Sequence, residues 1–186
     1  RLCSEAGSQR VAVLPFPDRE EKEFDLQFAA KKYKELIKIG MNEYGIQPMF
    51  EFIGFLKGMH RLGQACAVAI DADDPNAIVL PDTFHLYRGG SGFSGVKQIG
   101  GDFIGNFHWN DVPASPGQFE LGDKDRIYPG DGILPLTQCF KDLKAIGYTK
   151  AVSLELFNRD LWAQDPMQVG RDGLKKMLDN IKAAGV

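Results

Sequence analysis

Hydrophobic and polar positions alternate with two different periods along this chain. Short runs rich in β-branched and aromatic residues predict strands at 11–16, 47–53, 77–80, 103–108 and 151–156. Longer segments with apolar residues at helical spacing predict helices at 24–42, 56–69, 134–146 and 166–184. Such alternation is typical of βα units around a parallel sheet, so the sequence predicts an α/β fold of five units.

The composition is that of an ordinary globular domain. The chain has 186 residues, of which 44% are hydrophobic, 25% charged and 11% aromatic, which is enough apolar material for one sizeable core. We therefore expect a single domain over residues 1–186. Nothing approaches the roughly 18 consecutive apolar residues of a membrane span, and the first residues lack a signal-peptide layout, so we expect no membrane association.

Charge and cysteine content narrow the function classes further. A formal net charge of −3 argues against the basic face that nucleic-acid binding requires. Cys3, Cys66 and Cys139 are far apart and form no CxxC pair, so we expect neither a disulfide framework nor a thiolate zinc site. These features predict a cytoplasmic protein without a nucleic-acid partner.

An ionisable residue lies at or just beyond the carboxyl end of each of the last four predicted strands: Glu51, Asp82, His108 and Glu155. In parallel α/β folds the loops at this end form the active-site face, so the four side chains should converge. Clustered carboxylates in apolar surroundings need a positive partner. Because three carboxylates and one imidazole are hard ligands, they favour Mn²⁺, Mg²⁺ or Co²⁺ over a thiolate type of zinc site.

Each of these residues also has a purely structural interpretation. Glu51 and Glu155 could be buried partners of Lys or Arg, and His108 could be a hydrogen-bonded core histidine. The equivalent positions of all four residues at strand ends favour the metal site.

Two further residues are candidates for substrate contact. His85 lies three residues beyond Asp82, in what we expect to be a loop, and Arg126 lies in the long polar connection 110–132. An arginine beside a metal can clamp a substrate oxygen, and a neutral histidine can donate to the same oxygen. Arg126 could instead form a surface ion pair with Asp123 or Asp125. His60 is expected inside the helix 56–69, as a solvated or capping side chain.

Five segments together resemble the sugar isomerase and epimerase superfamily with xylose-isomerase-like TIM barrels. They are FEFIG, PDTFHLYRGG, HWND, DRIYPGDGILPL and SLELFN. This superfamily includes inosose isomerases and dehydratases, hydroxypyruvate isomerases and ketose 3-epimerases, and HWND with DRIYPGDG looks most like the inosose-processing branch. The resemblance implies a TIM barrel fold and a role in carbohydrate metabolism, specifically in inositol catabolism.

The same resemblance implies roles for the candidate residues. The four strand-end residues would bind a divalent metal, Mn²⁺ first, with Mg²⁺, Co²⁺ or Zn²⁺ as alternatives. His85 and Arg126 would hold oxygens of a small-molecule substrate. Glu51 and Glu155 would also be catalytic, one as a base and the other returning a proton.

The implied activity is that of a metal-dependent isomerase or epimerase. It would act on a ketosugar, an inosose or a related polyol ketone by proton transfer through an enediolate. Loss of a β-hydroxyl from that intermediate would make the enzyme an inosose dehydratase, a lyase with the same metal site. Ketose epimerases carry a further acidic residue where this chain has Phe55, Leu56 and Lys57, which disfavours 3-epimerisation of a free ketose.

Two other function classes stay open. An abasic-site endonuclease has a related barrel, but it would need more histidine ligands than the three histidines here and a basic groove. A non-catalytic sugar-binding protein could retain the metal site without turnover.

The order of the motifs indicates that a chain of 186 residues is too short for a complete barrel. A TIM barrel closes with eight βα units in about 250 residues or more, and by motif position these five units correspond to strands 4 to 8. We therefore expect an incomplete barrel, in which roughly 100 residues before Arg1 are missing or a partner covers the open edge at the first strand. That partner could be a second copy in a homo-oligomer.

Overall fold

The computed structural model describes residues 1–16 and 18–185. Within these ranges there are five parallel strands: β1 (Arg10–Val13), β2 (Gln47–Glu51), β3 (Ile78–Leu80), β4 (Phe107–Trp109) and β5 (Val152–Leu154). β1, β2 and β3 pair in that order, and β4 pairs with β5. Parallel bridges from Val79 to Ile104 and from Asp82 to His108 link the two sheets. The strands therefore follow their chain order along one arc.

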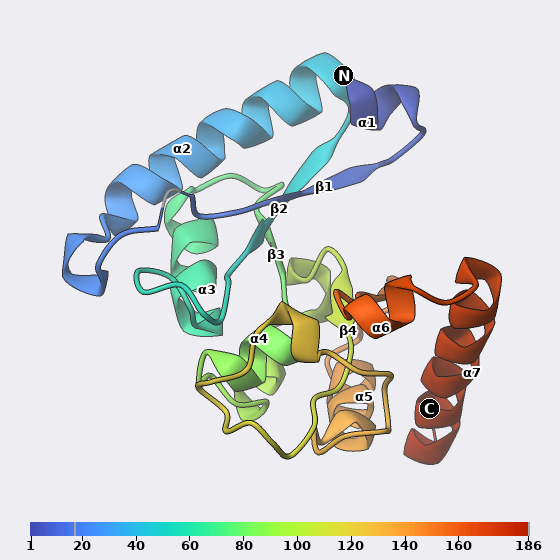
Figure 1. Ribbon diagram of the computed structural model, residues 1–186. Helices are drawn as coiled ribbons and strands as arrows, with labels where there is room; N and C mark the ends of the chain where they lie inside the picture. Colours follow the sequence, from blue (N-terminus) through green and yellow to red (C-terminus); the bar gives the residue numbers. More distant parts are fainter. Residues whose placement is uncertain (17, 186) are drawn as a thin grey trace.

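Helices connect the strands, and α2 and α7 lie at opposite ends of the molecule (Figure 1). The helices between strands are α2 (Leu26–Ile39), α3 (Leu62–Asp71), α4 (Thr83–Arg88) and α5 (Leu136–Ala145), and α7 (Pro166–Ala184) comes after β5. Three short helices, α1 (Leu2–Glu5), α4 and α6 (Arg159–Trp162), have no counterpart in the predicted pattern. α2 packs against α3, and α5 packs against α7. None of the described helices is both long and apolar enough to cross a membrane.

The two faces of the sheet are buried differently. Successive strand residues point to opposite sides, and Phe50 and Val79 belong to the main core with residues of α2 and α3 such as Ile37 and Val68. The neighbouring positions on the other face form a small separate cluster, made of Met49, Ile78 and Leu80. The helices thus cover one face of the sheet. The opposite face, which carries Met49, Ile78 and Leu80, is separate from the main core.

Tyr33 connects α2 to two strands. Its side chain is buried, and its hydroxyl donates to the carbonyl oxygen of Ile78 at 2.7 Å and accepts the Ile78 N–H at 3.0 Å. The carbonyl oxygen of Pro48 lies 3.0 Å away. Burial raises the pKa of Tyr33 to about 12, so the phenol keeps its hydrogen and pairs with the N–H and carbonyl groups of Ile78.

The helix expected over 56–69 begins only at Leu62, and this prediction was wrong for its first residues. Gln64 explains the difference, because its Oε1 accepts the backbone N–H groups of His60 at 2.9 Å and Arg61 at 3.0 Å. This side chain caps the helix at its third position and stops it from extending backwards. His60 therefore lies before the helix and not inside it.

The strand expected over 103–108 was also wrong in its first half. A 3₁₀ turn covers Gly101–Phe103, and β4 begins only at Phe107. A Cβ atom on Gly105 would lie 2.5 Å from Ile78 Cδ1, so the chain passes unusually close to β3 at this point. The other predicted elements occur, with ends that differ by a few residues.

We expect Tyr33→Phe to lower the free energy of unfolding by about 1–3 kcal/mol, because buried polar groups of Ile78 lose their partner. Tyr44→Phe is the matched control, since the Tyr44 ring is 38% exposed. Urea denaturation followed by circular dichroism measures both variants. A loss in Tyr33→Phe no larger than in the control would contradict this role of Tyr33.

Candidate metal centre

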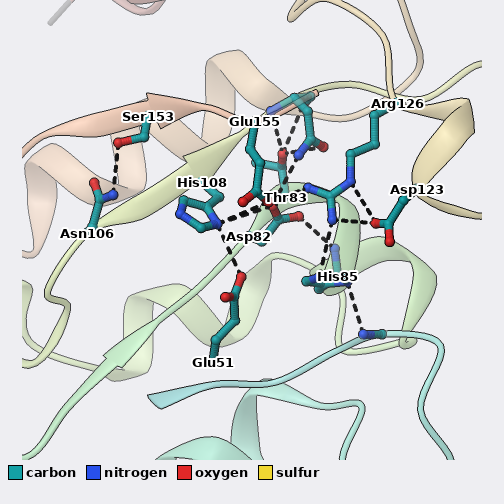
Figure 2. A network of polar contacts seen from close by, with 12 residues as sticks. Glu51, Asp82, Thr83, His85, Asn106, His108, Asp123, Arg126, Ser153 and Glu155 are labelled. Atoms are coloured by element: carbon teal, nitrogen blue, oxygen red, sulfur yellow. Dashed lines mark hydrogen bonds and ion pairs between the residues drawn. The ribbon is translucent and has the colours of Figure 1, made fainter. Parts of the chain in front are cut away.

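The four strand-end residues lie together in space (Figure 2). Glu51 ends β2, Asp82 follows β3, His108 lies within β4 and Glu155 follows β5. One ligand-type atom of each lies within 4.8 Å of the others. His108 Nδ1 is 3.1 Å from Glu51 Oε1, 3.2 Å from Glu155 Oε2 and 3.9 Å from Asp82 Oδ2. We call this group the carboxylate–histidine cluster.

Protonation within the cluster reflects burial and close charges. Burial raises the pKa of Glu51 to about 7, although the hydrogen bond from His108 works against the shift. Burial alone would lower the pKa of His108, but its hydrogen bonds to Glu155 and Glu51 more than offset this and raise that pKa to about 10. Without a metal, His108 is therefore an imidazolium that partly neutralises the carboxylates.

Arg126 brings a second positive charge to the cluster. Its Nη1 donates to Asp82 Oδ2 at 2.8 Å and to Glu155 Oε2 at 2.7 Å. On its other side, Asp123 Oδ1 accepts from Nε at 3.0 Å and from Nη2 at 2.7 Å. Asp123 therefore fixes the orientation of the guanidinium that faces the cluster.

The alternative of a surface ion pair for Arg126 was wrong. The pair with Asp123 exists, but the Arg126 side chain is only 1% exposed. Its Cζ lies 4.7 Å from the ring centroid of Phe84 and 5.1 Å from that of Phe157. These aromatic contacts remove the guanidinium from water, so its attraction to the carboxylates is weakly screened.

Asp82 is held through both carboxylate oxygens. Oδ1 accepts the His85 N–H at 2.9 Å and thereby caps α4, so the segment expected to be a loop after Asp82 is in fact the first turn of a helix. Oδ2 accepts from Asn110 Nδ2 at 3.1 Å. Thr83 Oγ1 in turn accepts the Asn110 N–H at 2.9 Å. Burial alone would raise the pKa of Asp82, but Arg126 holds it below the usual value.

His85 is a buried neutral imidazole beside Arg126. Burial lowers the pKa of His85 to about 4. Its Nδ1 accepts the Gly54 N–H at 3.0 Å, which leaves the ring hydrogen on Nε2. Nε2 lies 3.2 Å from Arg126 Nη2, which is also a donor. Two donors thus face one another, and an oxygen atom of a bound molecule could accept from both.

Sequence reasoning missed the residues that support this arrangement. Thr83 and Asn110 position Asp82, and Asp111 organises the loop that carries Arg126. The signal was present in HWND, where two polar residues directly follow the strand of His108. Their partners come from other segments, so spacing alone did not reveal them.

The residues present fit a divalent cation. Three carboxylates and one imidazole offer the hard donors that such ions prefer. Three carboxylates, those of Asp82, Asp123 and Glu155, pair with the guanidinium of Arg126, and Glu51 adds a fourth beside His108, so the carboxylates outnumber the cationic groups of the site. A divalent cation would compensate that excess.

Parallel βα units with polar residues gathered at the carboxyl ends of the strands define an α/β protein of the barrel type. The profile of the family described as Xylose isomerase-like TIM barrel matches residues 1–181, and the chain belongs to this family. The predicted fold class and the predicted resemblance are thereby confirmed. That the barrel is incomplete stays a prediction.

Individual relatives agree with this assignment. The chain is 29% identical over 175 residues to the inosose isomerase of Bacillus subtilis, which covers 91% of this chain and 62% of that one. It is 27% identical over 135 residues to the 3-dehydroshikimate dehydratase of Pseudomonas putida, covering 72% of this chain and 21% of that one. A crystal structure of the IOLI protein with a bound zinc atom superposes with a TM-score of 0.87 at 27% identity, covering 96% and 65% of the two chains. The chain thus spans less than two thirds of the length of these relatives.

We expect the His85 ring to stay neutral to about pH 4 and to carry its hydrogen on Nε2, because it is buried and Nδ1 accepts from Gly54. Long-range ¹H–¹⁵N correlation spectra of the metal-free protein between pH 8 and pH 5 report both properties, with the signals assigned from a His85→Asn variant. A ring hydrogen on Nδ1, or titration of His85 within this range, would contradict the assignment.

Proposed function

We propose that this chain carries the site of a divalent-metal-dependent isomerase or epimerase acting on a ketosugar, an inosose or a related polyol ketone. The observation that carries the proposal is the carboxylate–histidine cluster, with the paired donors of His85 and Arg126 beside it. The inosose isomerase name of a relative supports the substrate class.

Glu51, Asp82, His108 and Glu155 would hold the cation. Mn²⁺ is the first candidate from the donor types, and the zinc atom bound to the IOLI protein supports Zn²⁺ as an alternative. A divalent cation bound there supplies Lewis-acid polarisation of a substrate carbonyl group.

His85 and Arg126 would bind and orient the substrate. The Nε2–H of His85 and an N–H of Arg126 both donate to one carbonyl or hydroxyl oxygen, which removes the conflict between these two donors. Asp123 and the contacts with Phe84 and Phe157 keep the guanidinium in place for this purpose. The guanidinium is therefore already oriented when the substrate binds, so binding loses little free energy in ordering it.

Glu51 and Glu155 would move the proton. One carboxylate removes the hydrogen from the carbon next to the carbonyl, so that a C–H bond breaks and a carboxyl O–H bond forms. The other, in its protonated form, gives its proton to the former carbonyl carbon. The hydrogen of the adjacent hydroxyl passes to the former carbonyl oxygen, so this hydroxyl becomes the new carbonyl and the isomerisation is complete. Both oxygens lie beside His108, and the side chain of Glu155 is 29% exposed against 6% for Glu51. Glu155 is thus the more accessible of the two to a ligand.

A second candidate function is dehydration. The first proton transfer is the same, but a β-hydroxyl group then leaves instead of a proton returning to the neighbouring carbon. The relative that is named a dehydratase favours this possibility. Analysis of the products formed from an inosose distinguishes the two outcomes.

We expect Glu155→Gln to abolish exchange of solvent deuterium into an inosose at saturating Mn²⁺, because an amide cannot accept the proton. Proton NMR of the inosose in D₂O measures the exchange. Glu43→Gln is the matched control, since Glu43 is an exposed residue outside the site. Exchange at the unmodified rate in Glu155→Gln would sink the catalytic role of this residue.

We also expect the affinity for Mn²⁺ to rise with pH. His108, with a pKa of about 10, holds a proton that the metal must displace, so affinity should rise about tenfold per unit above pH 7. Below pH 7 the Glu51 carboxyl also becomes protonated, which makes the dependence steeper. Calorimetric titration between pH 6 and pH 8, in buffers of different ionisation enthalpy, gives both affinity and proton release. A constant affinity with no proton release would contradict binding at this cluster.

A further inference from the structure

Asp111 is a buried carboxylate outside the carboxylate–histidine cluster. It lies two residues beyond the end of β4 and is 1% exposed. Its Oδ1 accepts the backbone N–H groups of Val112 and Leu134, both at 2.9 Å. Its Oδ2 accepts those of Gly130 at 3.0 Å and Gly132 at 3.1 Å. Each oxygen accepts two hydrogen bonds, so this carboxylate gathers four N–H groups around itself.

The backbone of Asp111 is tied to the same loop. Its N–H donates to the carbonyl oxygen of Ile127 at 3.0 Å, and the Ile127 N–H donates back to the Asp111 carbonyl at 2.9 Å. Arg126 is the residue before Ile127, and its own carbonyl accepts from Asn158 Nδ2 at 3.2 Å. The backbone that carries Arg126 is therefore fixed on both sides.

The glycines of the loop make this close approach possible. A Cβ atom on Gly132 would lie 2.1 Å from the Val112 carbonyl oxygen and 2.4 Å from Asp111 Oδ1. Gly130 has a φ of +90°, which residues with side chains rarely adopt. The sequence of this turn is thus fitted to the Asp111 carboxylate.

We propose that Asp111 is a positioning residue, which holds Arg126 in the site by folding residues 127–134 back onto the end of β4. The geometry of Arg126 toward Asp82 and Glu155 then depends on a carboxylate that touches neither of them. This assignment rests on the proposed function only for the role of Arg126 in binding substrate.

Asp111→Asn tests the proposal in the full chain. An Asn side chain has one acceptor oxygen, and its NH₂ group would face two N–H donors of the loop. We expect the backbone amides of residues 127–134 to lose at least about tenfold in hydrogen-exchange protection. Arg126, which is buried in the unmodified protein, should become reactive toward phenylglyoxal, and peptide mass spectrometry measures this reaction.

The metal and kinetic readouts separate positioning from general destabilisation. None of the four residues of the cluster belongs to this loop, and displacing Arg126 removes a positive charge beside Asp82 and Glu155, so the affinity for Mn²⁺ should be retained or should rise. The KM for an inosose should rise at least about tenfold, because Arg126 is displaced.

Two further variants keep the test decisive. Asp131→Asn removes the same charge from the same loop, but Asp131 is 40% exposed and pairs with Lys176, so it should change none of the readouts. Gly132→Ala forces the loop away from Asp111 without a change of charge and should reproduce the pattern of Asp111→Asn. It carries the test if Asp111→Asn fails to fold.

Three results decide the matter. Unchanged exchange protection and an unreactive Arg126 in both Asp111→Asn and Gly132→Ala would overturn the proposal. A loss of Mn²⁺ affinity as large as the rise in KM would overturn the proposal as well, because Asp111 would then support the whole site. If the loop responds as expected while the unmodified protein with Mn²⁺ exchanges no deuterium into any ketone offered, the positioning role stands and the proposed function fails.

Discussion

Repulsion among closely spaced carboxylates is the constraint on which the rest of the site depends. Glu51, Asp82 and Glu155 point toward one imidazole, and the cost of burying such charges is large unless positive groups compensate them. The proton on His108 and the guanidinium of Arg126 provide that compensation in the metal-free protein. These two cationic groups balance part of the charge of the cluster, and its remaining negative charge suits a divalent cation.

The fold separates two tasks between strands and loop. Parallel strands whose carboxyl ends lie at one edge deliver the four candidate ligands, and the bridge between Asp82 and His108 aligns β3 with β4 at the site itself. The cationic residue comes from the long connection after β4, where a single antiparallel bridge between Asp111 and Ile127 is the only strand-like pairing near Arg126 in the described residues. Side-chain contacts therefore do for Arg126 what strand pairing does for the ligands, and Asp123 and Asp111 are the main ones.

The sequence predicted the parts of the structure whose signals are local. Glu51 stands out because a carboxylate interrupts the apolar run MFEFIG, and α7 was predicted with its observed bounds because its apolar positions recur at helical spacing. The start of α3 could not be predicted in the same way, since it depends on which backbone groups the Gln64 side chain accepts. Likewise the sequence offered Asp123 or Asp125 as a surface partner of Arg126, but it did not show the burial of Arg126 against Phe84, because that contact joins residues distant in sequence.

Asp82 does two things with one carboxylate: Oδ1 caps α4, while Oδ2 faces the cluster. Fold and the proposed chemistry are therefore coupled at this position. A replacement such as Asp82→Ala removes the candidate ligand and the cap together, whereas Asp82→Asn keeps an acceptor for the cap and changes only the group that faces the cluster. For an evolving sequence the same coupling narrows the choice: only residues that still cap the helix, such as Asn, Ser or Thr, can replace this carboxylate without weakening the helix that carries His85.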